Sequence, residues 1–171
     1  MKKQNVKSFI AIMSLLIGML FIPSCKDECK DVTCLNGGTC EEGICTCATG
    51  YEGEFCATEM RAKFLATYTL TDGCYPTAAN NDPIISVSAE GVIKVNISNI
   101  LGGTLGGSAK AEVNGSNITI PGQTVTDSEG ASWTIEGMST GTMASGSFNI
   151  SIKYIFGSAP AETCIMTFSK K

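Results

Sequence analysis

The sequence predicts a mainly β protein made of a small disulfide-rich module followed by an antiparallel β-barrel, with a β-sandwich as the alternative for the second part. Three observations predict this. Seven of the nine cysteines lie between Cys25 and Cys56, residues 60–171 alternate apolar and polar side chains, and no long helical period interrupts that alternation. A chain of 171 residues has room for one ordinary domain and one small module.

Residues 1–24 have the pattern of a secretory signal peptide. A basic start is followed by an apolar run over residues 9–22, and the small Ser24 stands just before Cys25. The apolar run is shorter than the roughly 20 residues that cross a bilayer as a helix, so a retained transmembrane anchor is the weaker alternative. The pattern therefore predicts export, which agrees with a chain rich in cysteine.

The residues around Cys25 point to a lipid anchor. The run Ile22-Pro23-Ser24-Cys25 resembles a bacterial lipobox, although Ile and Pro replace the usual Leu and small residue. Lys26-Asp27-Glu28 resembles the surface-export signal of Bacteroidota-type lipoproteins. These resemblances imply a lipidated Cys25, an outer-membrane lipid as partner and exposure at the cell surface.

Cysteine parity agrees with that assignment. Nine is an odd number, and giving Cys25 to lipid leaves eight cysteines that can pair. The alternatives are an intermolecular disulfide through Cys25 or a free thiol at that position.

Six further cysteines follow the spacing Cys29-x4-Cys34-x5-Cys40-x4-Cys45-x-Cys47-x8-Cys56. Six cysteines alone allow fifteen connectivities. The spacing, with the segments CLNGGTC and CTCATGYEGEFC, resembles an EGF-like domain and places it within residues 25–59. That resemblance implies the pairs Cys29 with Cys40, Cys34 with Cys45 and Cys47 with Cys56. Such a short segment needs disulfides because its core is too small to hold it folded.

Charge and ligand chemistry exclude several functions. Without residues 1–24 the chain has nine basic and sixteen acidic residues, so its formal charge of −7 argues against a nucleic-acid partner. Most of the excess lies between Lys26 and Glu59. The calcium pattern of EGF-like domains is incomplete, because Cys25 occupies the first acid position and residues 41–44 lack the later ligands. We expect neither a metal site nor a cofactor.

Residues 60–171 contain about eight alternating segments. Asn114-Gly115-Ser116 predicts a hairpin turn, and Pro121-Gly122 predicts a turn or bulge inside a long strand region. The glycine-rich residues 100–108 predict a flexible strand connection, because no helix follows them as a phosphate-binding loop requires. The predicted strands are Phe64–Leu70, Ile84–Ser88, Ile93–Ser98, Ala109–Val113, Asn117–Ile120, Trp133–Glu136, Ser147–Phe156 and Cys164–Ser169.

The last two cysteines bear on barrel closure. Cys74 follows the first predicted strand and Cys164 opens the last one. In an up-and-down meander of eight strands these two ends meet, so a Cys74–Cys164 disulfide would close a barrel; the same bond could also join the sheets of a sandwich. In its strand pattern and terminal cysteine pair, this segment resembles the lipocalin-like β-domains of small bacterial lipoproteins.

Nothing in the sequence predicts catalysis. Histidine is absent, no serine lies in a nucleophile elbow, and no motif pairs two carboxylates as acid and base. We therefore expect a lipid-anchored cell-surface binding or interaction protein that is not an enzyme, with a protein, a glycan or a small apolar molecule as the partner classes left open.

Two alternatives have distinct structural requirements. A lipocalin-like carrier of a small apolar ligand would need a lined interior cavity of roughly several hundred Å³. A hydrolase or inhibitor would need converging carboxylates, and sugar stacking would need exposed aromatic rings. The candidate carboxylates are Asp72, Asp82, Asp127 and Glu162, and the candidate rings are Tyr75, Trp133 and Tyr154.

Overall fold

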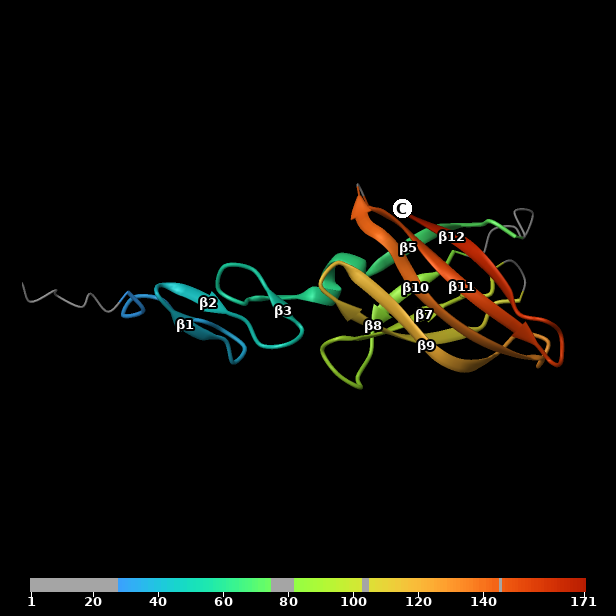
Figure 1. Cartoon of the computed structure of the whole chain (residues 1–171), viewed down its shortest axis with the longest axis horizontal. Coiled ribbons are helices and arrows are strands. Elements are labelled where there is room, and N and C mark those ends of the chain that lie inside the picture. Colours follow the sequence, from blue (N-terminus) through green and yellow to red (C-terminus); the bar gives the residue numbers. More distant parts are fainter. Residues whose placement is uncertain (1–27, 75–81, 103–104, 145) are drawn as a thin grey trace, which may run out of the picture.

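The computed structural model of the chain describes residues 28–74, 82–102, 105–144 and 146–171. Cys25, Lys26 and Asp27 lie outside these residues together with the predicted signal peptide, and Glu28 is exposed. The molecule is elongated, with a cysteine-rich module (residues 28–59) at one end and a closed barrel at the other (Figure 1). The fold is thus mainly β, as the sequence predicts.

The cysteine-rich module consists of two small antiparallel sheets. β1 (Thr39–Glu41) pairs with β2 (Ile44–Thr46), and β3 (Tyr51–Glu52) pairs with β4 (Thr58–Glu59). Three disulfides connect the sheets and loops, and they are the pairs that the resemblance implies: Cys29–Cys40, Cys34–Cys45 and Cys47–Cys56. In residues 28–59 only Gly50 and Cys56 are buried, so covalent bonds replace an apolar core.

Eight antiparallel strands close the barrel in the order β10-β11-β12-β5-β6-β7-β8-β9. Each strand follows its neighbour in the chain, and β12 pairs with β5 to complete the ring, which confirms the barrel and excludes the sandwich. A disulfide joins Cys74 to Cys164 beside that closing pair, with 5.6 Å between the Cα atoms. The strands are β5 (Ala66–Asp72), β6 (Ile84–Val87), β7 (Lys94–Ser98), β8 (Ser108–Asn114), β9 (Asn117–Thr126), β10 (Ser132–Ala144), β11 (Ser147–Phe156) and β12 (Glu162–Lys170).

Large side chains fill the barrel interior. Phe148 stacks on Phe168 with ring centroids 5.0 Å apart, and the edges of Phe64 and Tyr68 meet it at 5.5 Å. Aliphatic side chains from the other strands complete this cluster. Burying each such side chain contributes about 1.5 to 3 kcal/mol, so the barrel is stabilised by its packed core.

Apolar residues outside the strands cover both ends of the barrel. At the end beside the module, a 3-10 helix, η1 (Met60–Phe64), buries Phe64 completely. The prediction that Phe64 begins a strand is therefore wrong; β5 starts at Ala66 because the Phe64 ring turns inward onto Phe148. At the far end, buried Ile100 and Leu101 pack on the core, so this part of the predicted flexible connection is a packed loop.

Arg61 joins the module to the barrel. Its Nη1 atom donates to the backbone carbonyls of Ser88, Gly91 and Lys94 at 2.9 to 3.0 Å, and its Nε donates to Glu59 at 2.8 Å. Nη1 has two protons for three acceptors, so at least one proton is shared. The side chain is only 11% exposed, and it fixes the β6–β7 turn to the last residue of the module.

A close backbone contact lies beside the Arg61 bonds. Gly50 has a φ of +93°, and a Cβ atom there would lie 2.4 Å from Val92 Cγ1 and 3.1 Å from Ile93 Cγ2. Glycine is therefore required both for the conformation and for the approach. An ion pair between Lys63 and Glu52 adds a third connection, at 2.8 Å. Together these contacts hold the two parts in one orientation.

Candidate functional site

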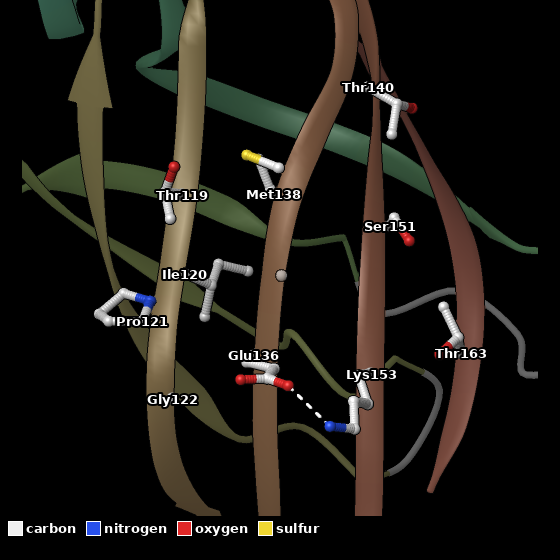
Figure 2. Close-up of a pocket in the computed structure, with 11 residues that line it drawn as sticks. Thr119, Ile120, Pro121, Gly122, Glu136, Met138, Thr140, Ser151, Lys153 and Thr163 are labelled. Atoms are coloured by element: carbon white, nitrogen blue, oxygen red, sulfur yellow. Dashed lines mark hydrogen bonds and ion pairs between the residues drawn. The ribbon is translucent and has the colours of Figure 1, made fainter.

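A groove of about 600 Å³ lies on the outer wall of the barrel, across β9, β10, β11 and β12 (Figure 2). Most of its lining side chains stand on the outer faces of these strands, whereas Ile120 belongs to the packed core. The lining residues are Thr119, Ile120, Pro121, Gly122, Glu136, Gly137, Met138, Thr140, Ser151, Lys153 and Thr163.

A bulge in β9 shapes the groove. Ile135 pairs with Gln123 whereas Gly137 pairs with Ile120, so Pro121 and Gly122 together stand opposite the single residue Glu136. This confirms the bulge predicted at Pro121-Gly122. Bulges bend and twist a strand, and a glycine at this point leaves the wall without a side chain next to Glu136.

Gly137 lets β10 and β11 approach closely behind the groove. A Cβ atom at this position would lie 3.0 Å from both Ile152 Cγ1 and the Ser151 carbonyl oxygen. A larger residue would push β10 away from β11, because neither backbone nor a packed isoleucine can yield. The hollow therefore depends on a glycine inside the wall as well as on the bulge.

One ion pair crosses the groove. Lys153 Nζ donates to Glu136 Oε1 at 2.8 Å, and the two residues are directly opposite in β11 and β10 (Figure 2). The second carboxylate oxygen, Oε2, lies 3.8 Å from where a Cβ of Gly122 would be, so it faces the notch left by that glycine. Both side chains are about half exposed, at 43% for Lys153 and 54% for Glu136, and such a pair contributes at most about 1 kcal/mol to stability.

Four hydroxyl groups line the groove, and Figure 2 shows them on one side of the ion pair. They belong to Thr119, Thr140, Ser151 and Thr163, and within the described part of the chain none of these hydroxyls bonds to another protein group. Met138 lies among them and is 60% exposed. Each hydroxyl can both donate and accept, so the groove offers several polar groups on a lining that is otherwise mostly apolar and includes Met138, Pro121 and Ile120.

Asp127, one of the predicted candidate carboxylates, serves the β9–β10 turn. It accepts from Trp133 Nε1 at 2.9 Å, Ala131 N at 2.8 Å and Glu129 N at 3.0 Å. The bond from Trp133 is the main cause that lowers the pKa of the Asp127 carboxyl. The indole ring also packs at 4.7 Å on Phe156, so Trp133 is a structural residue of the far end.

Asp72 lies at the far end of the barrel. It accepts from Cys74 N at 2.7 Å and lines a cavity of about 30 Å³ that also contacts Trp133 and Tyr154. That volume suits one water molecule. Asp72 also lies close to the sulfur atoms of Cys74 and Cys164, but those atoms are joined to each other and cannot act as thiolate ligands.

The remaining candidates do not build a site with Asp72 or Asp127. Asp82 forms an ion pair with Lys171, and Glu162 is exposed at the start of β12. Tyr154 is only 7% exposed and bonds to Met166 Sδ, while Tyr75 lies outside the described residues. The groove residues were not predicted as a site, although the bulge at Pro121-Gly122 was the available signal.

No protein-family model matches the chain, and no solved structure matches it. Among the described residues, no helix is both long enough and apolar enough to cross a membrane. The groove is therefore identified as the candidate site from its geometry and chemistry.

Proposed function

We propose that this protein is a lipid-anchored binding protein of the bacterial outer membrane, exposed at the cell surface, with no catalytic activity. In this proposal the cysteine-rich module is an EGF-like spacer between the lipid on Cys25 and the barrel, and the groove on β9–β12 is the binding site. The observation that carries it is the junction, where Arg61 bonds to three carbonyls of the β6–β7 turn.

Fixing the junction has a clear consequence for binding. A module held by Arg61, by the Gly50 contact and by the Lys63–Glu52 ion pair transmits its orientation to the barrel. In this proposal the rigid module therefore presents the groove in one orientation relative to the anchored end of the chain. The first-third, second-fourth and fifth-sixth order of the three disulfides supports the EGF-like assignment.

The groove supports binding rather than catalysis. Its one carboxylate, on Glu136, is already paired with Lys153, and the groove has no second acidic group within its lining. A general acid and base pair needs two titratable groups held at different pKa values. Among the described residues none of the Ser and Thr hydroxyls there is hydrogen-bonded to Glu136 or Lys153, as an activated nucleophile would be to its base.

A carrier function has less support than surface binding. A carrier would need room inside the barrel, and the interior is occupied by the aromatic cluster of Tyr68, Phe148 and Phe168. The small cavity at the far end holds about 30 Å³. Drug-sized ligands need roughly 300 Å³ or more, so the outer groove is the better candidate.

Metabolic labelling with a palmitate analogue tests the anchor. We expect the wild-type protein to incorporate the label and to fractionate with the outer membrane, and Cys25→Ala to lose both properties because the acceptor sulfur is gone. The double variant Cys74→Ser/Cys164→Ser is the matched control, since it removes cysteines but keeps Cys25. Equal labelling of Cys25→Ala and wild type would contradict the lipid anchor.

Protease treatment of intact cells tests surface exposure. We expect the barrel epitope to be lost from cells that display the wild-type protein, while a periplasmic marker persists. Protection of the epitope until the outer membrane is permeabilised would contradict exposure at the cell surface.

A further inference from the structure

We propose that the groove on β9–β12 binds a neutral oligosaccharide. This inference rests on the proposed function, because it names the ligand class of the same site. The structural basis is a single groove that gathers four hydroxyls without a partner among the described residues, one internally neutralised ion pair and the exposed side chain of Met138.

The charge of the groove selects against ionic ligands. Glu136 and Lys153 are its charged residues and cancel each other, so neither an anion nor a cation gains net attraction there. The ion pair can accept further hydrogen bonds and donate others, because Glu136 Oε2 and two protons of Lys153 Nζ bond to no other group among the described residues. A neutral ligand with many hydroxyls can bond to both groups without separating them.

The hydroxyls of the groove match the same ligand chemistry. Thr119, Thr140, Ser151 and Thr163 each donate one hydrogen bond and accept others, as sugar hydroxyls do. They come from four neighbouring strands, so the set spans three strand spacings, or about 14 Å. That length suits a chain of several sugar units better than a single one.

Met138 supplies the apolar contact in the middle of the groove. Its register partners are Thr119 in β9 and Ser151 in β11, so Met138, which is 60% exposed, stands between two hydroxyl-bearing residues in one cross-strand row. Figure 2 shows Met138 between β9 and β10, on the side opposite to Lys153. A flexible, polarisable side chain can pack on the C–H face of a sugar ring while the flanking hydroxyls bond to its edge.

A peptide fits the groove less well. Extended peptides commonly bind by adding a strand to an open sheet edge, and here each of the strands β9 to β12 already pairs with a neighbour on both sides. A peptide would also leave main-chain groups to be satisfied by side-chain hydroxyls alone. We treat peptide binding as an outcome of the test.

Calorimetric titration of the full chain carrying Cys25→Ala tests the proposal. The probes are uncharged hexasaccharides of β-1,4-linked glucose, mannose and xylose, with hexagalacturonate as the anionic comparator and an uncharged Gly-Ser-Thr peptide as the peptide comparator. We expect at least one neutral hexasaccharide to bind, with amide shifts in the nuclear magnetic resonance spectrum confined to β9–β12, and neither comparator to bind there.

Variants then test the groove itself. Glu136→Gln removes a charged acceptor, and we expect about a tenfold or larger loss of affinity. Ser151→Ala/Thr163→Val removes two hydroxyls with little change in shape, and we expect a similar loss. Asp82→Asn is the matched control, because Asp82 forms an exposed ion pair with Lys171 just before β6, which is not one of the four groove strands. Ser108→Ala is the hydroxyl control.

Three results would overturn the proposal. They are no binding of any neutral hexasaccharide at millimolar concentration, equal affinity in Glu136→Gln and wild type, and preferential binding of the peptide or of hexagalacturonate in the groove. Peptide or anion binding there would leave the surface-binding function standing with another ligand. If the wild-type protein takes up no palmitate label or is not exposed at the cell surface, the proposed function is contradicted. Such a result leaves the oligosaccharide test unaffected.

Discussion

The cysteine-rich module and the barrel reach a fixed structure by opposite means. In residues 28–59 only Gly50 and Cys56 are buried, and three disulfides hold the sheets together. In the barrel, a continuous apolar cluster runs through all eight strands, and one disulfide joins Cys74 to Cys164. The difference follows from size, because a short segment cannot bury enough apolar surface to offset its conformational entropy.

Charge also separates the two parts. Residues 28–59 have seven acidic residues and one basic residue, whereas residues 60–171 have eight acidic and seven basic residues. Two of the acidic groups of the module form ion pairs, and both partners lie in η1: Glu52 pairs with Lys63 and Glu59 pairs with Arg61. These two acidic residues of the module therefore help to attach it to the barrel.

Reduction of the disulfides should give the largest effect, and it should affect the cysteine-rich module and the barrel differently. We expect a thiol reductant under native conditions to unfold the module, because three disulfides of about 2 to 4 kcal/mol each stabilise a segment without a core. The barrel should keep its strands. Two-dimensional amide spectra of the reduced and oxidised chain measure this. In the reduced chain we expect the amide shifts of residues 28–59 to lose their dispersion and those of the barrel to keep it.

The double variant Cys74→Ser/Cys164→Ser is the control for that experiment, since the reductant can then act only on the module. A reduced module that keeps its dispersed shifts would show that contacts other than disulfides hold it.

Removing the barrel disulfide tests how much the core holds on its own. The bond closes a loop of 90 residues, for which the chain-entropy model gives about 4 to 5 kcal/mol. We expect Cys74→Ser/Cys164→Ser to lose close to that free energy of unfolding in urea while the native spectrum is unchanged. A barrel that no longer folds at all would show that the closure of β12 on β5 depends on the covalent bond.

A substitution at Arg61 should lower the free energy of unfolding by an intermediate amount. Arg61→Lys keeps the charge but has one nitrogen, so it cannot bond to Glu59 through Nε and to the carbonyls of the β6–β7 turn through Nη1 at the same time. We expect a loss of about 1.5 to 3 kcal/mol in the free energy of unfolding. We also expect the module to tumble faster than the barrel in nitrogen-15 relaxation, whereas both parts share one correlation time in the wild type. Lys153→Ala is the control, because it removes an exposed ion pair with Glu136 on β10 and β11, whose described residues form no hydrogen bond with Arg61.

A feature could be predicted from the sequence when the residues that determine it are close together in the chain or have a recognisable side chain. The strands follow from local alternation. The pairing of Cys74 with Cys164 favoured a closed barrel but was also compatible with a sandwich, so only the strand order of the structure decides between them. The Arg61 bonds could not be predicted, since their acceptors are backbone carbonyls 27 to 33 residues away that carry no side-chain signal. The groove could not be predicted for a similar reason. Ser and Thr residues are common on the outer faces of strands, and only the register of neighbouring strands brings these four together.

Titration of Tyr68 should give the smallest effect, and only in the barrel. Burial raises the pKa of Tyr68 to about 12 from 10.0, and its hydroxyl donates to the Phe64 carbonyl at 2.8 Å. Because the folded state favours the neutral phenol, its contribution is fully present below about pH 10 and is lost as the pH rises toward 12. We therefore expect the urea midpoint of the barrel to fall across that interval. Tyr68→Phe should be about 1 kcal/mol less stable at neutral pH and should show a shallower alkaline fall. An equal fall in both proteins would assign the alkaline loss to other groups, and the core around Phe148 would then tolerate a charged phenolate.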